Sequence, residues 1–146
     1  MSDPRIVGFL NRALAHELSA VQQYLAQARL TALWGLDEVS ECLRRDAQEE
    51  LEHADRFITR MLYYGIAPQG GQLASVRLGR SMAELQARNR ELEMEAVRLY
   101  DEAAAYCRRT GASDDAALFE AILEDELEHV REIDAHSGDA QASPEQ

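Results

Sequence analysis

The tetrapeptide ELEH occupies residues 50–53 and recurs at residues 126–129, which gives an interval of 76 residues (50 to 126). The same interval aligns residues 17–24 (ELSAVQQY) with residues 93–100 (EMEAVRLY). A repeat at a fixed interval indicates that one supersecondary unit, here a helical hairpin, occurs twice in the chain. The repeated residues are mostly polar, so packing alone does not account for them. The identical pairs in the longer segments are Glu17/Glu93, Ala20/Ala96, Val21/Val97 and Tyr24/Tyr100.

The composition is typical of a soluble, mostly helical protein of one domain. Of its 146 residues, 46% are hydrophobic and 29% are charged. No apolar run approaches the roughly 18–20 residues of a membrane helix, and the N-terminus lacks the features of a signal peptide. The net charge of −12 argues against a nucleic-acid partner and suits the collection of metal cations. We therefore expect a cytoplasmic protein with no membrane or nucleic-acid partner, whose two cysteines are reduced thiols.

Apolar residues recur at steps of three and four along most of the chain, which predicts helices. Short turns at Gly35 and Gly111 make two antiparallel hairpins, whereas the linker at residues 66–80 can span roughly 50 Å and cross the whole bundle. The fold class is therefore all-α, a four-helix bundle with a long crossover between helices two and three. The expected elements are helices over 4–33 and 37–64, a helix opening with the capping box at 81–84, a turn at 110–113, and a last helix before residue 136. Residues 1–135 are expected to form the bundle and residues 136–146 a polar, disordered tail.

Six polar residues are expected on the core-facing sides of these helices at one height. In each hairpin two glutamates lie almost equidistant from the turn, which places them side by side halfway along the bundle. A histidine follows one glutamate of each hairpin by three residues and shares its face. A single buried glutamate or histidine is more often part of an ordinary core, but four carboxylates without basic partners are too costly to bury. Two divalent cations would balance them, and mixed oxygen and imidazole ligands suit iron, manganese or zinc. The six site residues are Glu17, Glu50, His53, Glu93, Glu126 and His129.

Three segments of the chain resemble the bacterioferritin family. They are LNRALAHELSAVQQYLAQARLTALWGL (10–36), EELEHADRFITRML (49–62) and ILEDELEHVREID (122–134), and the similarity covers roughly residues 6–134. A glutamate from each of two helices, with Glu-x-x-His from the other two, is also the site pattern of ferritin-like dinuclear carboxylate proteins. The resemblance implies a ferritin-like fold and a ferroxidase site that holds two iron ions per subunit on the six site residues.

The resemblance further implies a role for each residue of the site. Tyr24 corresponds to the family's near-site tyrosine, a candidate electron donor, although a tyrosine at such a position is usually only a core residue. The implied metal roles are bridging for Glu50 and Glu126, and terminal ligation for Glu17 with His53 and for Glu93 with His129.

Three features depart from the family pattern. Leu51 stands where bacterioferritins carry a haem-ligating methionine, so haem is not expected. Arg45 and Glu49 stand where the family's inner-surface iron site has a histidine and an aspartate, and an arginine there would repel Fe²⁺. No counterpart of the family's fifth helix is expected in the polar segment that follows the fourth helix, so a homo-oligomeric cage of 12 subunits is expected in preference to 24 subunits or a free dimer. The apolar stripe expected at a subunit contact consists of Ala47, Leu51, Ala54 and Ile58.

The expected function is ferroxidase activity with iron storage or detoxification, in which Fe²⁺ is the substrate and O₂ or H₂O₂ the oxidant. A ferredoxin-type reductant is the partner expected for release of stored iron. One alternative is a rubrerythrin-like di-iron peroxidase that does not store iron, although two cysteines cannot form the four-cysteine site such enzymes usually carry. Another is a metal-free helical adaptor whose acidic seam binds some other partner.

Overall fold

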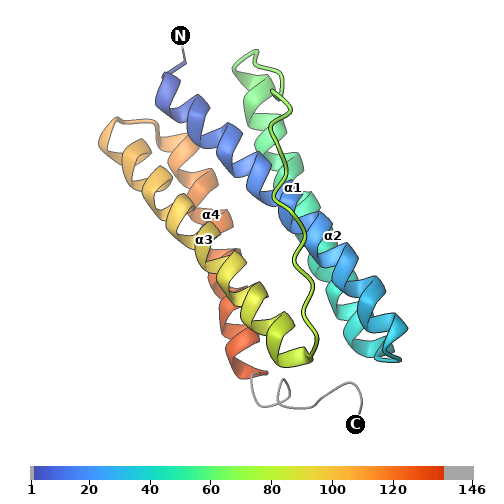
Figure 1. The fold of residues 1–146 in the computed structure, drawn as a ribbon. Helices are drawn as coiled ribbons and strands as arrows, with labels where there is room; N and C mark the ends of the chain where they lie inside the picture. Colours follow the sequence, from blue (N-terminus) through green and yellow to red (C-terminus); the bar gives the residue numbers. More distant parts are fainter. Residues whose placement is uncertain (1, 137–146) are drawn as a thin grey trace.

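The structure is a computed structural model that describes residues 2–136, and these residues form four α-helices and no strand (Figure 1). Of the polar tail expected at residues 136–146, all but residue 136 lies outside the described residues. Within the described range no helix is both long and apolar enough to cross a membrane. The all-α prediction is confirmed. The helices are α1 (Pro4–Leu33), α2 (Asp37–Tyr63), α3 (Met82–Arg109) and α4 (Ser113–Ala135).

Local sequence signals fix where the helices begin and end. The Asp3 side chain caps α1 by accepting a hydrogen bond of 2.8 Å from the backbone N–H of Arg5. At α3 the Ser81 hydroxyl accepts a hydrogen bond of 3.2 Å from the N–H of Glu84. The two tight turns need backbone in the left-handed region, which Gly35 (φ 82°) and Gly111 (φ 79°) supply.

The segment between α2 and α3 runs along the outside of the bundle from one end to the other (Figure 1). It is tied to α1 by side-chain hydrogen bonds. The Gln23 amide donates to the carbonyl of Arg77 at 2.7 Å and accepts from the N–H of the same residue at 2.9 Å. The Ser19 hydroxyl accepts from the N–H of Ala74 at 2.9 Å. Because this crossover returns the chain to the opposite end, α2 and α3 run parallel, and each hairpin runs antiparallel.

Two apolar clusters fill the bundle, one toward each end. The first surrounds the rings of Phe9, Phe57 and Phe119, and the second surrounds Leu43 and Leu85. In α1, α2 and α3 a buried glutamate lies at the junction of the two clusters, and in α4 a buried glutamate follows the first cluster. A layer of buried glutamates therefore crosses the middle of the bundle between the two apolar clusters.

Candidate metal centre

The structure brings all six site residues together in this polar layer. Each helix contributes one glutamate, and α2 and α4 each add a histidine one turn further along. All four glutamates are 0% exposed, and His53 and His129 are 4% and 7% exposed. The equidistance of the glutamates from the hairpin turns, which is a property of the sequence, is thus realised as a single buried cluster.

The six side chains form two overlapping groups of four. In each group one ligand atom from every residue lies within 4.8 Å of the others. Glu17 and His53 belong to the first group only, and Glu93 and His129 to the second only, whereas both groups contain the glutamates of α2 and α4. Two sets of ligand atoms, each of which could hold a metal ion, thus share two carboxylates, Glu50 and Glu126.

Both imidazoles direct Nδ1 into the cluster. His53 Nδ1 lies 3.2 Å from Glu17 Oε1 and 3.6 Å from Glu126 Oε1. His129 Nδ1 lies 3.4 Å from both Glu93 Oε2 and Glu126 Oε1. Each imidazole therefore offers its inner nitrogen to one group of four.

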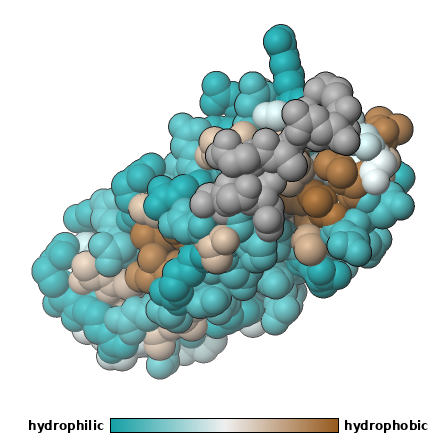
Figure 2. All heavy atoms as spheres, turned by 90° about the horizontal axis from the view of Figure 1, so that it is seen from below, coloured by the Kyte–Doolittle hydropathy of each residue, from teal (hydrophilic) through white to brown (hydrophobic). Residues whose placement is uncertain are grey.

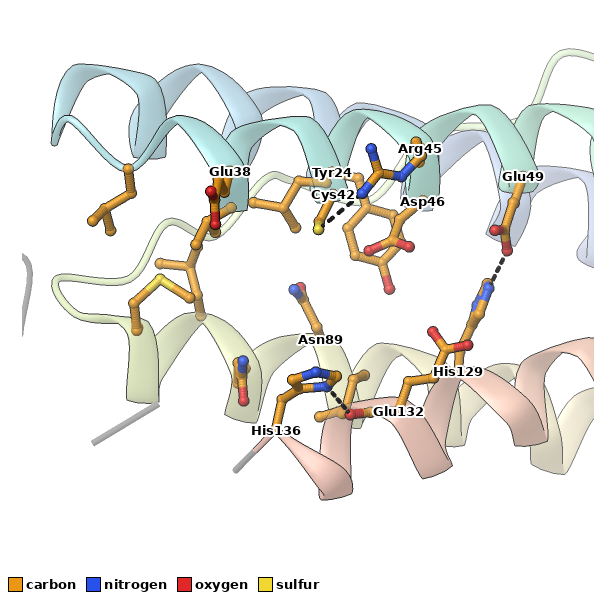
Figure 3. Close-up of a pocket in the computed structure, with 17 residues that line it drawn as sticks. Tyr24, Glu38, Cys42, Arg45, Asp46, Glu49, Asn89, His129, Glu132 and His136 are labelled. Atoms are coloured by element: carbon orange, nitrogen blue, oxygen red, sulfur yellow. Dashed lines mark hydrogen bonds and ion pairs between the residues drawn. The ribbon is translucent and has the colours of Figure 1, made fainter. Parts of the chain in front are cut away.

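The outer nitrogens of the imidazoles contact two further acids. His53 Nε2 lies 3.0 Å from Asp125 Oδ2, and His129 Nε2 contacts Glu49 (Figure 3). Glu49 and Asp125 are themselves 76 residues apart, each directly before an ELEH tetrapeptide. A carboxylate on the outer nitrogen fixes the tautomer and the orientation of a metal-binding histidine. The sequence analysis missed this role for both acids, although the acid before each ELEH was visible in the repeat.

Several oxygen atoms of the buried glutamates have no hydrogen-bond partner. They are both carboxylate oxygens of Glu50 and of Glu126 and one oxygen of Glu93. Burial, reinforced by the neighbouring carboxylates, raises the pKa of Glu50 and Glu126 well above the usual value. Buried oxygens without a donor are costly, and a cation would satisfy them. The residues present therefore fit a pair of divalent metal ions.

The histidine pKa values indicate how strongly the cluster favours positive charge. Burial lowers the pKa of His129, but the hydrogen bonds and charges of Glu126 and Glu93 outweigh it and raise the pKa to about 12. Burial also lowers the pKa of His53, but the hydrogen bond and the charge of Glu17 contribute most to an opposite effect that raises this pKa to about 9. Among the described residues these two imidazoles are the only groups that form salt bridges with the four site glutamates. A metal ion bound to these side chains would have to displace their protons, because metal ligands bind in the deprotonated form.

Two phenols donate hydrogen bonds to the cluster. Tyr24 Oη donates to Glu93 Oε1 at 2.5 Å, and Tyr100 Oη donates to Glu17 Oε2. Burial and the nearby glutamates raise the pKa of both phenols well above the usual value, so both hydroxyls keep their protons. The sequence analysis selected Tyr24 as a site residue and assigned no role to its repeat partner, Tyr100.

Two cavities adjoin the centre, and the linings of both include Glu49, His129 and Glu132. A cavity of about 510 Å³ has a largely apolar lining that includes Leu43 and Leu85, and Tyr24 and Asp46 point into it at its inner part (Figure 3). A second cavity of about 300 Å³ opens between α2 and α4 directly over the two imidazoles. Cations are attracted to clefts lined by negative charge. The acids of this second cavity, the acidic groove, are Glu49, Glu52, Asp125, Glu128 and Glu132.

The apolar stripe expected on α2 is narrower than predicted. Ala47 and Ala54 are buried in the core of the bundle, at 2% and 1% exposure, because helices of a bundle bury more than one row of side chains. Leu51 is 47% exposed and Ile58 is half-buried. With Leu18 of α1 these two residues line a shallow groove of about 540 Å³.

At the end of the bundle where α1 turns into α2, the surface is mostly hydrophilic with separate hydrophobic areas (Figure 2).

Comparison with known proteins agrees with this architecture. Residues 7–142 match the Ferritin-like domain of the ferritin family. The chain is 35% identical over 128 residues to a bacterioferritin of Rhodobacter capsulatus, an alignment that covers 88% of this chain and 80% of the relative. A bacterioferritin of Streptomyces coelicolor is 33% identical, with 88% and 77% covered, and one of Mycobacterium avium is 30% identical, with 88% and 80% covered.

Proposed function

Since the chain belongs to the bacterioferritin family of ferritin-like proteins, we propose that it is a ferroxidase that oxidises Fe²⁺ with O₂ or H₂O₂ and stores or detoxifies the Fe³⁺. The observation that carries the proposal is the pair of four-residue groups that share Glu50 and Glu126. Two cation positions with two common carboxylates hold two Fe²⁺ ions side by side, so that both can give electrons to one oxidant molecule.

The proposed roles of the site residues follow from this sharing. The shared carboxylates bridge the two iron positions, and each position is completed by one further glutamate and one histidine. Carboxylate oxygens favour the higher charge of Fe³⁺ over Fe²⁺, so the ligand set assists the loss of an electron from each ion. The terminal pairs are Glu17 with His53 and Glu93 with His129.

The groups around the site prepare it for the substrate. Fe²⁺ is attracted by the acidic groove, whose floor is formed by the two site histidines. Asp125 and Glu49 hold the proton of each imidazole on Nε2, which leaves Nδ1 free to bind iron. The apolar core on both sides keeps bulk water from the bridging carboxylates.

A titration of the intact protein tests the proposed activity. Anaerobic protein is loaded with Fe²⁺ and mixed with O₂ or with H₂O₂ in a stopped-flow instrument. The fast ferric absorbance should rise with added iron and level off at about two Fe²⁺ per chain, the loading of a dinuclear carboxylate site. Prior loading with Zn²⁺, which takes the same ligands and has no redox chemistry, should abolish it. A ferric signal with no break near that loading and no inhibition by Zn²⁺ would rule out oxidation at this site.

The same iron-loaded protein separates storage from the rubrerythrin-like alternative. A peroxidase would turn over H₂O₂ with an external reductant and would not accumulate iron. The free cysteines of the chain are Cys42, which is exposed, and Cys107, which is buried. They cannot supply the four thiolates of a rubredoxin site. We therefore favour storage, with a ferredoxin-type protein as the reductant that releases iron in the cytoplasm.

Haem is not expected to bind through the position of Leu51. This residue lies in the shallow groove on the outer face of α1 and α2, and leucine offers contact area but no sulfur ligand. The protein purified from haem-replete cells should show no Soret band, whereas Leu51→Met protein should acquire one if two copies meet at this groove. A Soret band that persists in the unaltered protein and disappears when another methionine is replaced would contradict this expectation.

The proposed storage function requires a closed homo-oligomer, because a single bundle encloses no volume for a mineral. The exposed apolar groove with Leu18, Leu51 and Ile58 is the proposed contact between paired subunits. The number of subunits stays a prediction, with 12 favoured over 24. Light scattering should give a mass near 12 times 16.4 kDa. Twice that mass would support the larger cage, and a stable dimer would exclude storage in a cavity.

A further inference from the structure

The two phenols of the metal centre occupy equivalent positions in its two halves. Tyr24 of α1 donates to Glu93 of α3, and Tyr100 of α3 donates to Glu17 of α1. The phenols are 76 residues apart, as are the glutamates that accept from them, and the two tyrosines are 2% and 0% exposed. Glu17 and Glu93, the terminal glutamates of the centre, therefore each accept a hydrogen bond from one phenol.

The contacts of Tyr100 give no packing reason for its hydroxyl. Its ring lies against Phe57, with 5.5 Å between ring centroids, and against Phe119, with 6.1 Å. A phenylalanine ring would fill the same space among these neighbours without a polar atom to bury. The hydroxyl reaches past them to the one carboxylate of α1 that belongs to the first metal position. The hydroxyl is thus directed at the reacting centre.

We propose that Tyr100 is a second electron donor of the centre, which acts alongside Tyr24 when O₂ is the oxidant. This inference rests on the proposed ferroxidase function. A phenol that gives up an electron must also lose its proton, and a carboxylate already hydrogen-bonded to the hydroxyl accepts that proton. Glu17 is placed to do this for Tyr100, as Glu93 is for Tyr24.

The pair of phenols completes the electron count of oxygen reduction. Reduction of O₂ to water takes four electrons, and two Fe²⁺ supply only two. Two Fe²⁺, two phenols and two protons from solvent convert one O₂ into two H₂O, and leave two Fe³⁺ and two tyrosyl radicals. The two phenol protons pass through the glutamates to the reduced oxygen, so each radical then returns to the phenol by taking an electron from a further Fe²⁺ and a proton from solvent. With H₂O₂ as oxidant, two Fe²⁺ suffice and the phenols have no electrons to provide.

The surroundings of the two tyrosines differ, which makes their radicals distinguishable. Tyr24 lines the cavity of about 510 Å³, through which a small solute can approach it. Tyr100 is fully buried, with Phe57, Phe119 and His16 around its ring. A radical on Tyr100 should therefore outlive one on Tyr24 in the presence of a small reductant such as ascorbate.

Rapid-freeze electron paramagnetic resonance tests the proposal on the intact protein loaded with two Fe²⁺ per chain. The Tyr24→Phe protein should retain a tyrosyl signal of about half the wild-type intensity that ascorbate removes slowly. The Tyr100→Phe protein should retain the other half, which ascorbate removes quickly. The double variant should lose the signal and release one H₂O₂ for each pair of Fe²⁺ oxidised. Tyr106→Phe is the matched control, because its hydroxyl donates to Asp3 at 2.6 Å, away from the centre.

Loss of the whole tyrosyl signal in Tyr24→Phe protein would overturn the inference. Comparison of oxidants separates electron donation from simple positioning of Glu17. An electron donor predicts that Tyr100→Phe loses more of the O₂-driven rate than of the H₂O₂-driven rate, whereas an equal loss with both oxidants would mean that the hydroxyl only positions the glutamate. Binding of two Co²⁺ per chain, followed by absorbance, confirms that the variant site is intact. Failure of the wild-type protein to oxidise Fe²⁺ would refute the proposed function, and oxidation without a Tyr100 signal would refute this inference alone.

Discussion

Exchange of Glu17 or of His129 for alanine should suppress the fast ferric absorbance that follows addition of about two Fe²⁺ per chain. The two residues belong to different groups of four. Under the proposed assignment, each change therefore removes a terminal ligand from a different iron position. Loss of an outer partner of a metal ligand typically costs about 10–100-fold in affinity or activity, and loss of the ligand itself should cost at least about 100-fold. Because two adjacent irons are needed to reduce one oxidant, damage to either position should disable both.

Glu41→Ala is the matched control for these variants. Glu41 is an exposed acid of α2 outside both groups, so its removal changes the net charge by the same amount as removal of Glu17. The rate of Fe²⁺ oxidation by the Glu41→Ala protein should stay close to that of the wild-type protein. Circular dichroism and native mass should show that all three variants keep the helical fold and the assembly. Ferric kinetics like those of wild type in both site variants would end the ferroxidase proposal.

The fold and the position of the site could be predicted because antiparallel hairpins leave little freedom. Once Gly35 and Gly111 mark the turns, residues at similar separations from a turn must lie close together, and the glutamates at 17 and 50 nearly satisfy this condition. The period of the apolar residues then decides which side chains face inward. Both pieces of information are local, so a single sequence carries them.

Other parts of the site depend on how the two hairpins pack against each other, which no local pattern encodes. Asp125 of α4 meets His53 of α2, and Glu49 of α2 meets His129 of α4, so each contact joins separate hairpins. The residue before an inward-facing glutamate points about 100° away from it on a helix and reads as surface. The same limit explains Ala47, which the sequence analysis placed on an outer stripe and which the bundle buries.

The capping box of α3 also differs from its sequence pattern in one contact that depends on distant packing. The Ser81 hydroxyl accepts from the N–H of Glu84, as the motif predicts. The Glu84 carboxylate, however, accepts from the N–H of Arg80 and not from that of Ser81. The incoming crossover segment fixes the direction of Arg80, and its path depends on the contacts with α1. The helix start was therefore predictable, whereas the partner of its glutamate was not.

Loading with Zn²⁺ should raise the thermal midpoint of unfolding by about 10–20 °C. A ligand that binds only the folded state at 100 times its dissociation constant stabilises it by about 2.7 kcal/mol, so two sites give about 5 kcal/mol. In a domain of this size each kcal/mol shifts the midpoint by about 2–4 °C. The physical source is the cluster of four glutamates at 0% exposure, whose unpartnered oxygens weaken the metal-free fold. Calorimetry with and without Zn²⁺ measures the shift.

A double variant, Glu50→Gln with Glu126→Gln, distinguishes stabilisation by zinc at the buried glutamates from general binding of zinc to an acidic protein. The amides keep the volume of the shared carboxyl groups, remove two buried acids and can donate hydrogen bonds to the glutamates that remain. Without metal the variant should therefore melt at a higher temperature than the wild-type protein, and Zn²⁺ should raise its midpoint little. The control pair Glu38→Gln with Glu41→Gln replaces two exposed acids of α2 outside both ligand groups and should keep the full zinc response. A double site variant that is less stable without metal and still responds fully to Zn²⁺ would show that the buried carboxylates neither destabilise the metal-free fold nor bind the ion.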